Sequence, residues 1–300
     1  MPAPGAIAVR EAQGAGLAGA RPARGARGRG EGFAPAVPAL ALLLCCFALP
    51  VLALLLRSLL DPRPGLENYA ALLATGTYYR VLANTFLVAG TVTAVTVLLG
   101  LPLAWFLAVA PAFWARLVFG IVVLSMWTNL LARTYAWMVL LQSTGVINRA
   151  LIALGLVSAP LPLIDNLTGV TIGMVYIMLP FMVLSLRMPL AALDRETFRA
   201  AALCGASRWQ AFWRVFLPLL MPGLASGALM IFVMALGYYI TPSLLGGTSN
   251  MMLAELIAQL VQSLLQWGVA GAAAFVLLAI TLSLYAVQVR LFGVRGAAGG

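Results

Sequence analysis

Long apolar runs, separated by short polar or proline-bearing stretches, dominate this sequence. Six of the runs reach the length of about 20 residues that a helix needs to cross a bilayer. None shows the period-two alternation of a membrane strand. The sequence therefore predicts an all-α, polytopic membrane protein with six transmembrane helices. The predicted spans are 34–56, 81–109, 117–141, 166–189, 219–245 and 268–289.

Three longer connections are predicted on one side of the spans, at 57–80, 142–165 and 246–267. The second contains an apolar stretch that is too short to cross, so we expect it to lie at the membrane interface or to re-enter. Asp165 and Glu255 fall in these connections. They could guide a cation or meet a binding protein, but the preferred interpretation is that they are solvated loop charges.

Composition excludes several classes of protein and of functional site. The chain is 63% apolar and only 9% charged, which is unlike a soluble domain. It contains no Lys and no His, so it lacks a phosphate-binding loop of the Walker A type and any His-based catalytic or metal site. Three cysteines, Cys45, Cys46 and Cys204, show no metal-ligand spacing and are interpreted as packing residues. We expect no catalytic residue, no metal and no cofactor.

Arginine distribution predicts the orientation. Positive charge accumulates on the cytoplasmic side of membrane proteins, and the segments opposite the three long connections hold most of the arginines. This places both termini on the cytoplasmic side of a bacterial-type inner membrane. Residues 1–33 are expected to be a disordered basic tail, 34–293 the membrane domain and 294–300 a short tail; no nucleic-acid partner is expected, since no aromatics interleave the arginines of the tail. The inward arginines are Arg10, Arg21, Arg24, Arg27, Arg29, Arg116, Arg187, Arg195, Arg199, Arg208, Arg214, Arg290 and Arg295, against Arg63, Arg80 and Arg149 outside.

Between the fourth and fifth spans, residues 194–218 predict a helix–Gly–helix hairpin. Asp194 is a candidate N-cap of an Ala-rich helix, and Gly205 is a candidate left-handed stop. Ser207 and Gln210 have the spacing of a capping box that starts a second helix. An aromatic stripe then follows at helical spacing, and two prolines are expected to interrupt the pattern before the fifth span. The stripe is Trp209, Phe212, Trp213 and Phe216, and the prolines are Pro218 and Pro222.

This hairpin resembles the cytoplasmic coupling loop of ABC importer permeases, whose pattern is Glu-Ala-Ala, three residues, Gly, about nine more residues and Leu-Pro. Arg199 stands where the family most often has Glu. A plain connector is the alternative interpretation. The matching residues are Ala200, Ala201, Gly205, Ala206, Leu217 and Pro218.

The segments LLARTYAWMVLL, GVTIGMVYIMLPFMVLSLRMPL and GYYITPSLLGGTSNMML extend the resemblance to permeases of spermidine/putrescine importers, over about 117–285. The resemblance implies alternating access driven by two cytoplasmic ABC ATPases, together with a second permease subunit and an external solute-binding protein. ATP hydrolysis would then reside on a partner chain. The implied cargo is a polyamine or a related small solute. In the hairpin, Ala200, Ala201 and Gly205 would form the docking surface, and the aromatic stripe, including Trp209, would anchor the second helix.

Polar residues inside the predicted spans are candidate pathway groups: Asn129, Arg133, Tyr238 and Tyr239. A charge at membrane depth is costly unless it is paired, hydrated or near the interface, so Arg133 could equally pair with Asp165 or snorkel. The two tyrosines could equally belong to an interfacial belt. Pairs of glycines four apart, at 169/173 and 223/227, indicate close helix packing, with a sliding contact as the alternative.

An ion-coupled secondary transporter, which needs no ATPase, is the competing function. Such proteins commonly place acids or His within their spans. The central predicted spans lack buried Asp, Glu and His, which argues against proton coupling. A scaffold without transport activity would leave the hairpin without a purpose.

Overall fold

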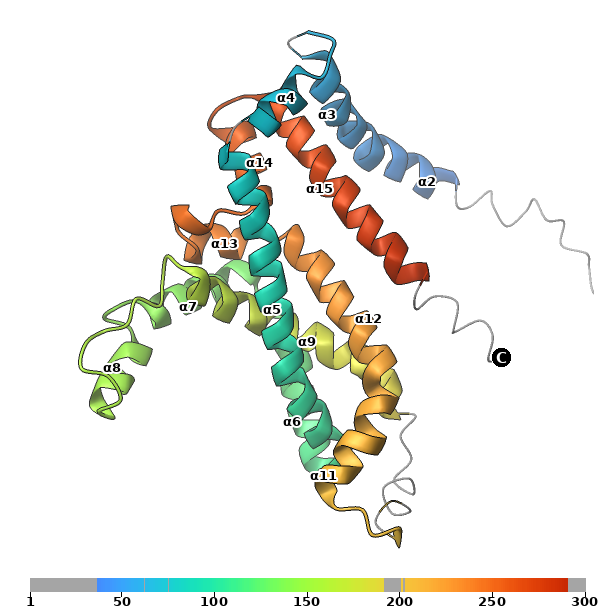
Figure 1. The fold of residues 1–300 in the computed structure, drawn as a ribbon, viewed down its shortest axis with the longest axis vertical. Coiled ribbons are helices and arrows are strands. Elements are labelled where there is room, and N and C mark those ends of the chain that lie inside the picture. Colours follow the sequence, from blue (N-terminus) through green and yellow to red (C-terminus); the bar gives the residue numbers. More distant parts are fainter. Residues whose placement is uncertain (1–36, 62, 75, 192–200, 202, 291–300) are drawn as a thin grey trace, which may run out of the picture. The chain divides into compact units, whose positions relative to one another are not determined.

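The computed structural model describes residues 37–61, 63–74, 76–191, 201 and 203–290, and all elements of this part of the chain are helical (Figure 1). The predicted tails 1–33 and 294–300, and the hairpin residues Asp194, Arg199 and Ala200, lie outside the described residues. The helices are α2 (Val37–Leu43), η2 (Leu44–Ala48), α3 (Leu49–Leu60), α4 (Glu67–Ala74), α5 (Gly76–Val109), α6 (Ala112–Met126), α7 (Leu130–Leu141), α8 (Val146–Ala153), α9 (Leu167–Ala191), α11 (Arg208–Ala211), η3 (Phe212–Phe216), α12 (Leu217–Leu236), α13 (Ile240–Leu245), η4 (Thr248–Asn250), α14 (Leu253–Gln262) and α15 (Trp267–Gln288).

Six helical stretches of the described part are long and apolar enough to cross a membrane, which confirms the predicted number. They are Val37–Leu60, Gly76–Val109, Leu130–Ala153, Leu167–Ala191, Trp209–Leu236 and Trp267–Gln288. Chain contacts divide the protein into two units, 1–51 and 52–300. The described residues of the first unit are helical, and their apolar side chains are almost all exposed, as suits a helix surrounded by lipid.

The predicted third span, 117–141, is wrong as a single helix. α6 ends at Met126 and α7 begins at Leu130. Asn129 caps α7, because its Oδ1 accepts the backbone N–H groups of Leu131 at 2.9 Å and Ala132 at 3.3 Å. An apolar pattern that runs through the break gave no sign of it.

The core of the second unit is the packing of α5, α9 and α12, which Figure 1 shows crossing one another. Methionines of α9 fill its centre: Met174, Met178 and Met182 are fully buried. Gly100 of α5 lies against Met182, because a β-carbon there would come within 2.7 Å of the methionine Cγ. Thioether side chains of this kind adapt to irregular gaps between helices.

The predicted fifth span, 219–245, is also divided, at Gly237–Tyr239 between α12 and α13. The short helix α13 packs between α7 and α9. Its Thr241 hydroxyl lies 3.2 Å from the Thr134 hydroxyl of α7. On the other side, a β-carbon on Gly173 of α9 would lie 2.9 Å from Thr241 Cγ2. The pair Gly169/Gly173 therefore serves close packing, as the sequence indicated.

α14 lies at the opposite end of α5 from the hairpin (Figure 1). Its apolar face, with Leu253, Leu256 and Leu260, packs against Val81 of α5 and Ala270 of α15. The Leu253 backbone N–H donates to Thr85 Oγ1 of α5 at 2.8 Å. This bond fixes the start of α14 to the second span.

Candidate functional site: the hairpin and the α9–α12 cavity

The first half of the hairpin ends at Gly205, as predicted. Gly205 has a φ of 79°, in the left-handed region that favours glycine. The Ala206 backbone N–H donates to the carbonyl of Ala201 at 3.0 Å, which is the long bond of a Schellman stop. Leu203 is 89% exposed, so the tip presents an apolar side chain away from the chain's own core.

A capping box starts the second half, again as predicted. The Gln210 backbone N–H donates to Ser207 Oγ at 3.2 Å, and the Ser207 backbone N–H donates to Gln210 Oε1 at 2.9 Å. The two bonds satisfy donors that a helix start otherwise leaves unpaired. Stop and start signals at 205 and 207 therefore define the turn that leads into α11.

The aromatic stripe divides into two faces. Phe212 and the fully buried Phe216 pack edge-on against Trp105 of α5, with ring centroids 5.3 and 4.7 Å away. Trp209 and Trp213 remain 70% and 49% exposed. Sequence periodicity found the stripe but could not identify Trp105, because its partners are about 100 positions away along the chain. The stripe anchors the hairpin to the second span.

The two prolines do not interrupt the helix, so that prediction is wrong. The helical stretch runs from Trp209 to Leu236 without a break. A π-helical turn, η3, carries the aromatic stripe directly into α12, and Pro218 lies in the first turn of α12. Such a turn accommodates a proline that cannot donate a backbone N–H. The second half of the hairpin and the fifth span are thus one continuous helical stretch.

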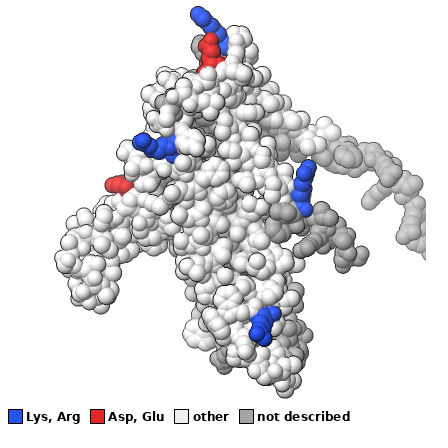
Figure 2. All heavy atoms as spheres, in the orientation of Figure 1, with Lys and Arg blue, Asp and Glu red and all other residues white. Residues whose placement is uncertain are grey.

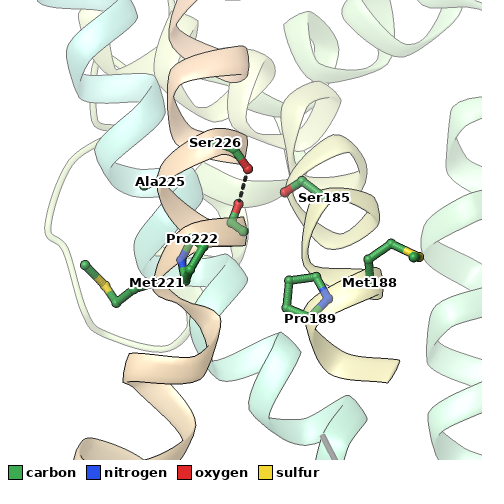
Figure 3. A pocket seen from close by; sticks show the side chains of 8 residues that line it. Ser185, Met188, Pro189, Met221, Pro222, Ala225 and Ser226 are labelled. Carbon is green, nitrogen blue, oxygen red and sulfur yellow. Dashed lines mark hydrogen bonds between the residues drawn. The ribbon is translucent and has the colours of Figure 1, made fainter. Parts of the chain in front are cut away.

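A cavity of about 540 Å³ opens between α9 and α12 (Figure 3). Ser185 and Pro189 line it from α9, and Pro222, Gly223 and Ser226 line it from α12. The remaining lining residues are Met188, Met221 and Ala225. None of these lining side chains is charged. The polar contacts that the cavity offers to a ligand therefore come from hydroxyl, thioether and backbone carbonyl groups.

The hydroxyls of this cavity are acceptors. Ser185 Oγ donates its proton to the Met182 carbonyl at 2.8 Å, and Ser226 Oγ donates to the Gly223 carbonyl at 3.0 Å. Each oxygen keeps lone pairs free. Pro189 has no N–H, so the Ser185 carbonyl also lacks its usual helical donor. The polar groups of the cavity therefore suit a ligand that only donates hydrogen bonds.

The four candidate pathway residues come together only in part. The Tyr238 hydroxyl lies within interaction range of Arg133 and Thr241. Arg133 Nη1 donates to the Ser125 carbonyl at 3.2 Å, in the last turn of α6, and its Nε has no partner. Asn129 is occupied as the α7 cap. The expected pair of Arg133 with Asp165 does not form in the described structure, and Tyr239 is the N-cap residue of α13.

Few charged side chains lie on the face in Figure 2: a basic and an acidic group lie together at its top, and the others stand apart. Asp165 is exposed, as expected for a loop charge, but Glu255 is only 8% exposed, so its interpretation as a solvated charge is wrong. The three cysteines are all exposed and unpaired rather than packed. Among the described residues no group of His, Cys, Asp or Glu has the geometry of a metal site.

Comparison with known proteins gives consistent matches. The sequence profile described as "Binding-protein-dependent transport system inner membrane component" matches residues 97–292. The spermidine/putrescine transport system permease protein PotB of Escherichia coli (strain K12) is 35% identical over 219 residues, covering 73% of this chain and 79% of PotB. The inner membrane ABC transporter permease protein YdcU of the same organism is 34% identical over 249 residues, covering 77% of each chain.

Among solved structures, a bacterial alginate ABC transporter, crystallised with an alginate pentasaccharide-bound periplasmic protein, superposes with a TM-score of 0.72. The alignment covers 86% of this chain and 92% of that one, at 18% identity. At this identity the likeness concerns the fold.

Proposed function

Because this chain belongs to the family of binding-protein-dependent transport system inner membrane components, we propose how it works as the permease subunit of an ABC importer. Two ATPase subunits drive it from the cytoplasm, a second permease completes the pathway, and an external binding protein delivers the cargo. The cargo is a polyamine, with spermidine and putrescine as the first candidates. Nucleotide is hydrolysed on the ATPase chains.

The hairpin carries this proposal. Its surface is built to stay rigid, with a left-handed stop at Gly205 and a capping box two residues later. Trp209 and Leu203 project from it largely exposed. Movement of the tip is transmitted directly to α12, because Leu217 and Pro218 continue the same helix. The proposed docking surface is Ala200, Ala201 and Gly205, and the same coupling loop contains Arg199, Ala206 and Trp209.

Alternating access then follows from the packing of α12 on α9. Movement of the hairpin tilts α12 against α9 and changes the cavity between them, which forms the inner part of the pathway. Of the candidate pathway residues, Tyr238 and Tyr239 lie at the break between α12 and α13, Asn129 caps α7, and Arg133 lies in the first turn of α7. Both termini and the hairpin face the cytoplasm, as the arginine distribution supports.

Two observations support a polyamine cargo. PotB, named as a spermidine/putrescine permease, shares 35% of its aligned residues with this chain. The α9–α12 cavity also offers acceptors without a charged donor. An ammonium group has three donors and no acceptor, so it complements the oxygen atoms of this lining. Membership of a binding-protein-dependent family favours ATP-driven import over an ion-coupled transporter.

A charge placed on the hairpin tip tests the coupling. A β-carbon at Gly205 would meet nothing within 4 Å, so the internal cost of Gly205→Asp is the backbone strain of its positive φ. We expect this variant to insert normally but to lose ATP-driven uptake and co-purification with the ATPase. Gly155→Asp is the matched control, because Gly155 also has a positive φ, 69°, and open space around it.

Equal loss in both variants would show that backbone strain, and not docking, is responsible. Uptake by Gly205→Asp at the wild-type rate would contradict the coupling role. Labelling of Cys204, which is exposed beside the turn, gives the side of the membrane independently.

A further inference from the structure

We propose that Glu255 is an ammonium-binding residue that receives the cargo's cationic end at the side of the membrane opposite the hairpin. This inference rests on the proposed polyamine import. It starts from one unexplained atom: Glu255 Oε2 is buried and has no hydrogen-bond partner. Of the acidic side chains in the described part of the chain, Glu255 is the one that is buried.

Helix capping explains only part of this placement. Glu255 occupies the third position of α14, and the backbone N–H of Met252, the N-cap residue, donates to its carboxylate. This is the reciprocal half of a capping box. A carboxylate has two oxygens with about four acceptor positions. One backbone donor therefore leaves most of its capacity unused in a place where water is largely excluded.

The described helices that pack against α14 supply no buried positive side chain to pair with the Glu255 carboxylate. α14 packs against α15, α5 and α13. α13 and α15 contain no charged residue, and the one charged residue of α5, Arg80, is exposed. A buried carboxylate without a counter-charge is costly, so such groups generally pair with a cation. Since these described elements supply none, the carboxylate is available to a cation from outside them.

The polar face of α14 leads to this carboxylate. Gln259 and Gln262 follow Glu255 at four and seven residues, so the three lie on one face of the helix. Both glutamines are exposed, whereas Glu255 is buried. The apolar residues Leu253, Leu256 and Leu260 occupy the other side. The polar face of α14 therefore leads from exposed amide oxygens to a buried carboxylate. A route that an ammonium group follows inward requires acceptors in this order.

Hydrogen bonds to α5 hold the start of α14, and with it Glu255, in place. Leu253 donates to Thr85, and Asn84 Nδ2 donates to the Ser249 carbonyl at 3.0 Å just before α14. Both bonds tie the segment to α5, which passes along the core to the hairpin end. The carboxylate thus sits on an element connected to the helices that the hairpin moves. An acid at the outer end followed by a neutral acceptor cavity further in would capture a cation without trapping it.

The test uses the complete importer, reconstituted in proteoliposomes with its partner subunits and binding protein and supplied with radiolabelled putrescine or spermidine. Glu255→Gln keeps an oxygen that can accept the Met252 N–H but removes the charge. We expect its uptake rate, at saturating loaded binding protein, to fall at least tenfold. Binding-protein-stimulated ATP hydrolysis should persist, because the hairpin and α12 are unchanged. Glu255→Asp, which keeps the charge, should retain more uptake than Glu255→Gln.

Glu67→Gln is the matched control, since Glu67 also lies in the first turn of a helix at this end but is exposed. Wild-type uptake in Glu255→Gln, or an equal loss in Glu67→Gln, would overturn the proposal for Glu255 alone. Loss of the partner permease from the Glu255→Gln complex would also overturn it, by showing that a partner's basic side chain pairs with Glu255. If the wild-type importer moves no polyamine, the proposed cargo itself is wrong and this inference falls with it.

Discussion

Gly223 of α12 lies directly against Pro189 of α9: a β-carbon on the glycine would come within 2.5 Å of the proline Cγ. One turn further along α12, a β-carbon on Gly227 would collide with the Ser185 side chain. The two helices that flank the cavity therefore touch backbone to side chain. In the proposed mechanism, this contact would transmit movement of the hairpin to the fourth span.

Adding one methyl group at this contact should weaken it. We expect Gly223→Ala to cost about 1–3 kcal/mol, because small-to-large changes in a packed core force neighbouring atoms apart. Thermal unfolding of the detergent-purified protein, together with uptake by the importer, measures the effect. Gly90→Ala in α5 is the control, since its β-carbon would meet nothing within 4 Å. Equal stability of the two variants would contradict the close α9–α12 contact.

The bond between α14 and α5 predicts a second stability effect. Thr85→Val removes the acceptor of the Leu253 N–H and leaves a buried donor unpaired, at a cost of about 1–3 kcal/mol. Thr96→Val provides a matched comparison at another fully buried threonine of α5, whose hydroxyl donates to the Val92 carbonyl of its own helix. The melting temperature should fall for Thr85→Val and change little for Thr96→Val.

Asn148 organises the connection after α7. Its Nδ2 donates to the carbonyls of Gln142 at 3.1 Å and Leu161 at 3.0 Å, and its Oδ1 accepts the Leu161 N–H at 2.8 Å. Asn148→Ala should destabilise this segment by on the order of 2 kcal/mol, since it removes all three hydrogen bonds of a fully buried amide. Trypsin should then cleave faster after Arg149. Asn84→Ala, which loses one exposed bond, should leave that cleavage rate unchanged.

Burial raises the pKa of the Glu255 carboxyl above its ordinary value of 4.5, although the Met252 N–H opposes the shift. The folded protein then keeps a proton at pH values where the unfolded chain has lost it. This stabilisation is complete below about pH 4.5 and disappears as the pH rises through the folded-state pKa. Wild type should therefore gain thermal stability relative to Glu255→Gln as the pH is lowered from neutral, in the absence of polyamine. A constant difference between the two proteins across that range would contradict a raised pKa.

Local signals in the sequence predicted the hairpin because they act over a few residues. The left-handed glycine and the Ser207/Gln210 capping box need only their own neighbours, and both were found as expected. Periodicity also identified the aromatic stripe. It could not show that Phe216 packs on Trp105, since that contact joins segments about 100 positions apart.

Breaks inside apolar runs were not predicted. The hydropathy of 117–141 and 219–245 continues through the turns at Asn129 and Tyr238, because lipid and protein interior favour the same side chains. The prolines led to the opposite error, because they predicted an interruption where none occurs. A π-helical turn ahead of Pro218 lets the helix continue. A side-chain cap by Asn129 marks the first break, whereas α13 begins after Tyr239 without a side-chain cap hydrogen bond.

The sequence by itself determined the class of protein, the number of spans and the hairpin, because apolar length, helix stops and caps are local properties. Tertiary structure decided which polar groups are paired and which are buried. Glu255 looks like any loop acid in the sequence, and only the packing of α14 on α5 and α15 removes it from water and leaves its Oε2 without a hydrogen-bond partner. Burial is a property of all the neighbours together, and those neighbours come from distant parts of the chain.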